Sequence, residues 1–581
     1  MAFEFDLDNL NDNLDAFGLC CPESDDFIEK LEVLCKTYRK STDDISDEIV
    51  SVMNNAGKKR VDLNVIATLE ESLESQAQKL AHTPRSAKKP ARVPLAERSG
   101  FKLSALSGLG DDEKDSASNV GASAKLEGHF LEFSPFANSP ANEKFLRRPD
   151  PAHVISTIRG KKYAESGLTS TTNSAGRVEV ISKQPNALYG GDKSSLVIEA
   201  KARRMGDFAQ LLQNTFKEIE DWGNPLAPSV DVVYTYGQVV HDDTKDVEKF
   251  GEHSVALMTN DEDGTMVRLD LSKMVDDVTL FPGQIIAVRG LNETGQELVV
   301  DRIFTTPALP VSKIEVDTTK TIWFTCGPYT ASDNCGYEHL CELLDRVVAE
   351  KPDVLVMTGP FVDRRNTYLN KPVFTITYEQ LLEDLMMKIK GKLNNTNTEV
   401  IIQPSAANDL CATPVFPCPP FHSKKLESVK KIVQFVPDPC ILSLGTGGIQ
   451  IAVTSSEPIQ GLSGSEFHQS SDQENNDRLA RLSSHLLTQQ SIYPLEPTEM
   501  PTSMTDLLEV GRFFTSPHIV FAPSRLAPSA KNVNQTLFVN SSTLAKGPTG
   551  NYVKLTINKP AGELAPNETI ANYSNIQLLR I

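Results

Sequence analysis

The sequence predicts a multidomain α+β protein, and three observations support this fold class. The chain has 581 residues, more than a single hydrophobic core usually serves. Its first eighty residues carry apolar side chains at helical spacing, whereas residues 229–305 contain short strand-like runs. From residue 320 onward, strand patterns alternate with helical patterns. We therefore expect a helical module, a β-rich domain and a mixed domain.

Composition narrows the class of protein. A hydrophobic content of 39% and a charged content of 23% fit globular domains diluted by some disordered chain. No apolar run approaches the ~18–20 residues that span a bilayer, and the acidic start is unlike a signal peptide, so we expect the cytosol or nucleus and no membrane. The net charge of −19 disfavours a general nucleic-acid binder. The nine cysteines contain no Cys-x-x-Cys pair, so reduced thiols are expected instead of a zinc site.

Residues 1–80 are expected to form a small helical bundle. Phe3, Leu7, Leu10, Leu14 and Phe17 illustrate the helical spacing, which recurs in three later segments. This region holds 18 Asp and Glu against 8 Lys and Arg, a net charge of −10. The charge fits either a solvated face or a docking module for a basic partner.

Residues 81–160 are expected to be a disordered linker, because they are rich in Ser, Ala, Pro, Gly and charge. Ser/Thr-Pro dipeptides in accessible chain suit proline-directed kinases, and the candidate phosphorylation sites are Thr83, Ser134 and Ser139. Short basic runs suit nuclear import, and the candidate residues are Lys58, Lys59, Arg60, Lys88, Lys89 and Arg92.

A connecting segment, residues 161–228, is expected to contain a helix over 206–222. Residues 229–312 then carry about five short strands, including a hairpin signal at Asn292–Gly295, which predicts a small closed barrel of the OB type. Such barrels often bind single strands through aromatic side chains in a basic groove. Residues 229–305, however, hold 6 Lys and Arg against 15 Asp and Glu. A structural or protein-docking role is therefore favoured over DNA binding.

Residues 320–560 are expected to form the mixed domain, with helices near 336–350, 377–392, 477–490 and 503–514, followed by a tail at 561–581. Either two facing sheets covered by helices or one parallel α/β sheet would fit this pattern. The segment VLVMTGPFVD (354–363) resembles the G-D-x-x-D element of the calcineurin-like metallophosphoesterase fold. This domain is therefore expected to have that fold.

The metal ligands of that fold are largely replaced in this sequence. Two-metal hydrolysis needs carboxylates and several imidazoles around ions about 3.5–4 Å apart. Proline stands where the bridging acid belongs, and no H-x-H pair exists. The degenerate positions are Cys326, Pro328, Gly359, Pro360, Asp363, Asn408 and Asp409. We expect no bound metal, no catalytic residue and no cofactor, and we expect Asp363 to cap or pair locally.

No other catalytic motif replaces the missing one. The sequence lacks a G-x-S-x-G elbow, a phosphate-binding G-x-x-x-x-G-K-S/T loop and an H-E-x-x-H helix. Lone acids such as Asp353 and Asp438 are expected to be loop caps. An active phosphoesterase based on Asp363, Asn408 and Asp409 stays open as an alternative, as does a single-strand DNA-binding barrel.

The order of these parts resembles the B (accessory) subunit family of the DNA polymerase α–primase complex. The resemblance is carried by segments between about 200 and 550, namely 280–299, CGPYTASDN at 326–334, 352–363, 433–449, 486–497 and 522–533. The N-terminal module and linker are similar in character only.

The resemblance implies a non-catalytic scaffold that supports primer synthesis at the initiation of DNA replication in the nucleus. It implies that the barrel and the inactive phosphoesterase domain pack as one body, which binds the zinc-bearing C-terminal domain of the catalytic polymerase subunit. The primase subunits would belong to the same assembly, and the N-terminal module would recruit other replication factors. DNA contact would be weak or indirect.

Overall fold

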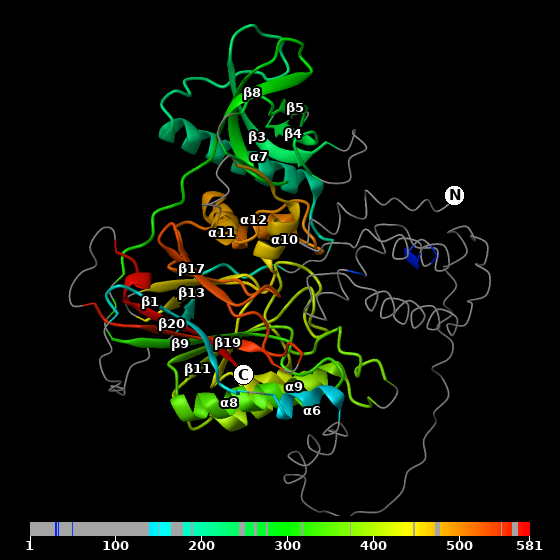
Figure 1. Ribbon diagram of the computed structural model, residues 1–581, viewed down its shortest axis with the longest axis vertical. Helices are drawn as coiled ribbons and strands as arrows, with labels where there is room; N and C mark the ends of the chain where they lie inside the picture. Colours follow the sequence, from blue (N-terminus) through cyan, green and yellow to red (C-terminus); the bar gives the residue numbers. More distant parts are fainter. Residues whose placement is uncertain are drawn as a thin grey trace, which may run out of the picture. The chain divides into compact units, whose positions relative to one another are not determined.

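The structure is a computed structural model of the chain, which divides into two compact units, residues 1–119 and 120–581 (Figure 1). In the first unit only Lys30, Leu31, Val33 and Ile49 are described, and all four are helical. The rest of the expected N-terminal bundle lies outside the described residues. The second unit is described over residues 139–581, except for 149, 164–177, 187–189, 243–249, 261–263, 275–276, 315, 317, 372–373, 446–447, 471–476, 548 and 561–567.

The mixed domain contains a seven-stranded sheet. Its central strands β9, β10 and β11 are parallel, with Val354 opposite Ile322 on one side and Glu399 on the other. Strand β19 is antiparallel to β9 and joins it to β20 and β1. The strand order is β1 (Val154–Arg159), β20 (Ser574–Arg580), β19 (Asn551–Ile557), β9 (Lys320–Cys326), β10 (Val354–Thr358), β11 (Glu399–Gln403) and β12 (Val433–Phe435).

A second, six-stranded sheet faces the first. Its strand order is β17 (Ser529–Val533), β18 (Thr536–Asn540), β16 (Ile519–Phe521), β14 (Ile449–Val453), β13 (Cys440–Leu444) and β2 (Val178–Val180). Side chains alternate between the faces of a strand, so Val354 and Val356 pack toward the second sheet, with Leu442 and Phe521 in the same core. Of the two arrangements that the sequence left open, the structure has the two facing sheets.

Helices cover the outer faces of both sheets. Leu355 and Met357 of β10 point away from the second sheet and share a core with α8 (Glu338–Glu350) and α9 (Tyr378–Leu393). The outer face of the second sheet packs on α10 (Pro458–Ser465), α11 (Arg478–Thr488) and α12 (Met504–Val510). Because both faces of β10 are covered, its five residues are all buried, as its unbroken apolar sequence predicts. The result is a four-layered domain of the expected phosphoesterase-like class.

The expected OB-type barrel is also present. Five strands form a closed barrel in the order β3 (Val233–His241), β4 (Val255–Thr259), β5 (Met266–Asp270), β8 (Glu297–Phe304) and β7 (Ile285–Leu291). The parallel pairing of β5 with β8 closes the barrel. A sixth short strand, β6 (Val278–Leu280), leaves the barrel and pairs with β15 (Phe467–Gln469) of the mixed domain.

The helix of the connecting segment is displaced from its expected position. Helix α7 spans Ser194–Thr215, whereas the sequence predicted 206–222. It therefore starts twelve residues earlier and ends seven residues earlier than predicted. Phe216 has an extended backbone, and Phe216 and Ile219 pack beside Phe304 of the barrel instead of continuing the helix. Figure 1 shows α7 running under the barrel beside α12.

The predicted domain boundaries also need correction. Helix α6 (Pro140–Leu146) and strand β1 lie within the expected linker, and β20 lies within the expected tail. Arg159 of β1 is opposite Asn575 of β20, so each segment obtains its strand pairing from a partner 416 positions away. Composition averaged along the chain could not reveal this pairing.

Two short 3₁₀ helices, η2 (Lys424–Ser428) and η3 (Ile570–Tyr573), complete the description. In the part of the chain described, no helix is long and apolar enough to cross a membrane.

Candidate functional site

The predicted site residues gather at one edge of the seven-stranded sheet. The register places Cys326 opposite Thr358, and Thr358 opposite Gln403, so β9, β10 and β11 end at the same level. The loops that follow parallel strands meet at this edge, where α/β proteins bind ligands. The loops hold Cys326, Pro328, Gly359, Pro360, Asp363, Asn408 and Asp409. Sequence spacing therefore located the edge correctly.

These loops touch one another directly. A Cβ atom added to Gly327 would lie 2.0 Å from the carbonyl oxygen of Pro360, and one added to Gly359 would lie 2.7 Å from the amide nitrogen of Ser405. Only glycine permits this approach, because any side chain would overlap backbone atoms. Pro360, which the sequence places at the position of the bridging acid, thus lies in close contact with the loop that follows β9.

Asp409 uses its carboxylate to hold the β10 loop. Its Oδ2 accepts a hydrogen bond from the N–H of Phe361 at 2.7 Å, and its Oδ1 accepts one from the N–H of Val362 at 3.3 Å. Burial raises the pKa of Asp409 to about 7, although the backbone hydrogen bonds oppose that shift. Both of its oxygens therefore hold the backbone of the neighbouring loop.

The Asp363 side chain is likewise used locally, and the backbone of Asn408 pairs with the same loop. The Asp363 carboxylate accepts the N–H of Arg365 at 3.0 Å, which confirms the prediction that this acid caps its own loop. Burial raises the pKa of Asp363. The carbonyl oxygen of Asn408 accepts the N–H of Arg364 at 3.0 Å.

Aromatic rings fill the remaining space. Tyr329 stacks on Phe361 with ring centroids 4.8 Å apart, and its hydroxyl donates to the carbonyl oxygen of Thr358 at 2.9 Å. The Tyr337 hydroxyl donates to the carbonyl oxygen of Phe361 at 2.8 Å. Burial raises the pKa of Cys326 to about 12, so this residue is a neutral thiol. Among the described residues there is no group of three His, Cys, Asp or Glu side chains that could hold a metal ion.

Two further acids, the buried Asp438 and the half-buried Asp353, have structural roles. Asp438 accepts hydrogen bonds from the Thr454 hydroxyl at 2.8 Å and from the Ser455 N–H at 3.1 Å. Burial raises the pKa of Asp438 to about 6. Asp353 accepts the N–H of Thr321 at 2.7 Å and its hydroxyl at 2.8 Å. Asp438 therefore caps a loop, as predicted, whereas Asp353 binds Thr321 of strand β9 and links the starts of β9 and β10.

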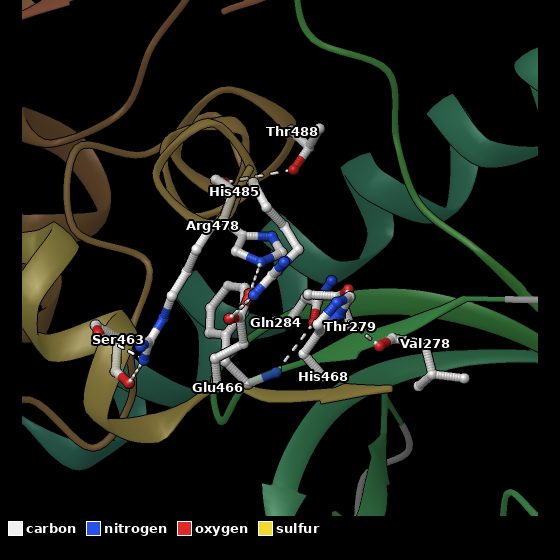
Figure 2. A network of polar contacts seen from close by, with 11 residues as sticks. Val278, Thr279, Gln284, Ser463, Glu466, His468, Arg478, His485 and Thr488 are labelled. Atoms are coloured by element: carbon white, nitrogen blue, oxygen red, sulfur yellow. Dashed lines mark hydrogen bonds and ion pairs between the residues drawn. The ribbon is translucent and has the colours of Figure 1, made fainter. Parts of the chain in front are cut away.

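The polar residues that join domains lie elsewhere, at the junction between the barrel and the mixed domain (Figure 2). Strands β6 and β15 pair there, with His468 opposite Thr279. The Nδ1 atom of His468 lies 2.9 Å from the Thr279 hydroxyl and 3.2 Å from the carbonyl oxygen of Val278. A two-stranded ladder and a histidine thus connect the two domains.

A second part of the junction is charged and almost fully buried. Glu466 Oε1 lies 3.0 Å from His485 Nε2, and its Oε2 accepts from Arg481 at 2.9 Å. Burial acts to raise the pKa of Glu466, but the hydrogen bonds from His485 and Arg481 outweigh it and lower the pKa to about 2. The His485 ring lies 4.8 Å from that of Phe281, which leads into the barrel. The Glu466 carboxylate therefore holds Arg481 and His485 of helix α11 in place, and His485 contacts Phe281 beside the barrel.

Gln489 adds a reciprocal pair of hydrogen bonds across the junction. Its Oε1 accepts the N–H of Ile285 at 2.8 Å, and its Nε2 donates to the carbonyl oxygen of Ile285 at 3.1 Å. Gln238 also donates to Glu496 at 2.9 Å. Sequence reasoning missed these residues, because a single glutamine 204 positions from its partner carries no local signal.

Three family models match the chain, and all of them describe the B subunit of replicative DNA polymerases. The N-terminal model of the DNA polymerase alpha B subunit matches residues 8–75, and the model of its OB domain matches 198–306. The model of the DNA polymerase alpha/epsilon B subunit matches 322–531. The chain is also 65% identical to the DNA polymerase alpha B subunit of Caenorhabditis elegans, with 100% of both proteins covered. The chain belongs to the family of DNA polymerase alpha B subunits.

More distant members of this B-subunit family are also similar. The chain is 26% identical to the Rattus norvegicus protein, covering 93% of this chain and 94% of that protein. It is 27% identical to the Saccharomyces cerevisiae protein, covering 61% and 58%. Among solved structures, Vacuolar Protein Sorting 29 from Cryptosporidium parvum is 12% identical, covers 46% of this chain and 99% of its own, and gives a TM-score of 0.21.

The barrel of this family member uses its aromatic side chains internally. Tyr236 lies 4.8 Å from Trp222, and Phe304 lies 5.1 Å from Phe216, measured between ring centroids. Arg289 is paired with Asp301 through two hydrogen bonds of 2.8 Å. These rings and this cation are therefore already engaged, which disfavours the alternative of a stacking platform for single-stranded DNA.

One predicted modification site lies in ordered chain. Ser139 is only 5% exposed and caps α6, where its hydroxyl accepts the N–H of Asn142 at 3.1 Å and donates to Asp333 at 3.3 Å. The expectation of flexible chain at Ser139 was wrong, because the serine begins a docked helix. The other candidates for phosphorylation and nuclear import lie outside the described residues, namely Thr83, Ser134, Lys58, Lys59, Arg60, Lys88, Lys89 and Arg92.

Proposed function

We propose that this chain is a non-catalytic scaffold and regulatory subunit of the DNA polymerase α–primase complex. In this role it binds the C-terminal, zinc-bearing domain of the catalytic subunit and supports primer synthesis when DNA replication begins. The main support is the filled edge of the phosphoesterase-like domain, where Asp409 holds the Phe361 and Val362 amides. Family membership provides the replication context.

The junction supports the scaffold role in a second way. A scaffold that holds a large partner benefits from a preformed surface, because ordering flexible segments on binding costs free energy. The barrel and the phosphoesterase-like domain are joined by the β6–β15 pairing and by the two Gln489 hydrogen bonds to Ile285. We propose that this joined body acts in the nucleus, and that residues 1–80 recruit other replication factors.

Native co-purification tests the proposal directly. A tagged full-length chain at its normal expression level should recover the catalytic polymerase subunit and both primase subunits in equal amounts. Recovery of a stable monomer from native cells would contradict the scaffold role.

Metal content and hydrolysis test the enzymatic alternative. The purified full-length chain should contain well under one transition-metal ion per molecule, and it should not hydrolyse a generic phosphodiester with added Mn²⁺. Hydrolysis that disappears in Asp363→Ala and Asp409→Ala would support an active phosphoesterase instead.

A further inference from the structure

Helix α6 is a short element docked on the phosphoesterase-like domain. It has seven residues, and its Phe145 is 2% exposed within the core that contains α8 and α9. Leu146, the next residue, is 66% exposed. An isolated helix of this length is not stable in water. The order of residues 139–148 therefore depends on their docking, and we call this segment the α6 latch.

The start of the α6 latch is held by polar contacts with the loop that follows β9. The N–H of Ala141 donates to the Asp333 carboxylate at 3.3 Å. The side-chain amide of Asn334 donates to the Ser139 hydroxyl oxygen at 2.9 Å. Water can replace each of these bonds when the segment leaves, so their net contribution to docking is small.

The end of the α6 latch is held by one arginine. Arg148 donates to the carbonyl oxygen of Ile581 at 2.9 Å and forms an ion pair with Glu342 of α8. Its guanidinium carbon also lies 3.7 Å from the ring centroid of Phe145. The latch is therefore fastened at both ends, with the Phe145 ring between them.

A buried histidine lies against the same ring. His339 of α8 is 1% exposed, and its ring centroid lies 3.8 Å from that of Phe145. Among the described residues, neither ring nitrogen of His339 has a hydrogen-bond partner. A neutral imidazole has one donor and one acceptor, and burying both of them unpaired costs free energy. The closed latch carries this cost, because opening would let water reach both nitrogens.

A proton on His339 favours the open latch. Burial lowers the pKa of His339 to about 4, with the Arg148 guanidinium acting in the same direction and Glu342 in the opposite one. These are the charged side chains that face the ring, one from the chain after α6 and one from α8. A histidine in water titrates near 6.5, so the open latch takes up its proton at a higher pH than the closed latch. The closed form is fully favoured above pH 6.5 and is progressively lost as the pH falls toward 4.

We propose that the α6 latch opens when His339 takes up a proton from solvent. In the closed form Phe145 covers the neutral imidazole, and in the open form water solvates the imidazolium. Strand β1 stays paired with β20, so the release ends before residue 154. Residues 139–152 then add roughly 45 Å of reach, at ~3.3 Å per residue, to the chain that precedes them. This inference goes beyond the scaffold function and does not depend on it.

Hydrogen exchange of the full-length chain tests the latch. The amides of 142–148 are followed from pH 7.5 to pH 5.5, and each rate is divided by the intrinsic exchange rate at that pH. The corrected rate should rise about tenfold over this range, the ratio that follows from a pKa of 6.5 in the open form and about 4 in the closed form. The amides of β10 should stay protected throughout, because only the latch opens.

Substitution of the histidine separates the latch from general destabilisation by acid. His339→Phe and His339→Leu remove both the titrating group and the unpaired nitrogens. Their corrected rates should be lower than those of wild type and should vary less than twofold with pH. His422→Gln is the matched control, because it removes an exposed histidine before η2 and should keep the tenfold response.

A second pair of variants tests the ring that closes the latch. Phe145→Ala should speed exchange of 142–148 at least tenfold at pH 7.5, whereas Leu146→Ala, at the exposed neighbouring position, should change it less than threefold. A wild-type response below twofold, or an equal response in both His339 variants, would overturn the inference. Loss of β10 protection together with that of 142–148 would also overturn it, because the domain would then open as a whole.

Discussion

The filled sheet edge and the barrel junction are built from similar residue types but use them differently. At the edge, Asp409 binds backbone amides of the neighbouring loop, and Tyr329 covers Phe361. At the junction, Gln489 binds Ile285 of the barrel, and Glu466 binds Arg481 and His485 of helix α11 in its own domain. The first region is closed on itself, whereas the second holds two domains together.

The comparison of the sheet edge with the barrel junction shows what buried polar groups do in each region. A buried polar group is costly unless it is hydrogen-bonded, so each one must contribute to structure or chemistry. At the edge these groups stabilise loops that would otherwise carry ligands. At the junction they fix the placement of the barrel. Buried polar groups thus stabilise loops in one region and a domain contact in the other.

The largest expected effect comes from opening the filled edge. Phe361→Ala removes a ring that is 1% exposed and stacked on Tyr329, so the free energy of unfolding should fall by about 3–5 kcal/mol. Denaturant unfolding of the full chain measures this loss. Phe514→Ala removes an exposed ring and should change stability by less than about 0.5 kcal/mol. Equal losses in the two variants would mean that the edge is not packed.

A smaller loss is expected when the acid at the edge is removed. Asp409→Ala leaves the buried N–H groups of Phe361 and Val362 without an acceptor, which should cost about 2–4 kcal/mol. Asp363→Ala loses one partly exposed cap and should cost under about 1 kcal/mol. Thermal melting of both variants gives the comparison. If Asp409→Ala were neutral, the carboxylate would not be holding the loop.

A substitution at the junction should disturb the structure more locally than a substitution at the sheet edge. Gln489→Ala removes both hydrogen bonds to Ile285 and should cost about 1–3 kcal/mol, because it leaves a buried N–H and C=O unpaired. Faster hydrogen exchange should appear in β7 and β15, while β9 to β11 keep their protection. Gln213→Ala is the control, because it removes one solvent-exposed hydrogen bond of α7. Uniform acceleration throughout the domain would show that the junction is not a separate unit.

The smallest effect is a pH dependence at the junction. The folded pKa of Glu466 is about 2, below its ordinary value of 4.5, so the ionised group stabilises the fold above pH 4.5. That contribution is lost as the pH falls from 4.5 toward 2. The difference in stability between wild type and Glu466→Gln should therefore shrink over this range. A stability difference between wild type and Glu466→Gln that stays constant from pH 6 to pH 2.5 would contradict the lowered pKa of Glu466.

Much of the fold could be predicted from local patterns, because its central elements satisfy local rules. Strand β10 is an unbroken apolar run ended by Gly359, and α8 was expected at 336–350 and is found at Glu338–Glu350. Motif spacing also indicated which residues follow β9, β10 and β11 at one edge of the sheet. Conversely, the start of α7 was missed because Leu196 and Ile198 are exposed and break the amphipathic pattern. Strands β1 and β20 and the Gln489 bonds depend on partners hundreds of positions away.

The pairing of β1 with β20 also has a consequence for biosynthesis. Arg159 is synthesised long before Asn575, its strand partner 416 positions later. Closing so long a loop is slow, and contacts of high sequence separation delay folding. The seven-stranded sheet cannot be completed on the ribosome before residues 574–580 emerge. Until then β1 lacks its strand partner, so the nascent chain needs protection from aggregation through most of its synthesis.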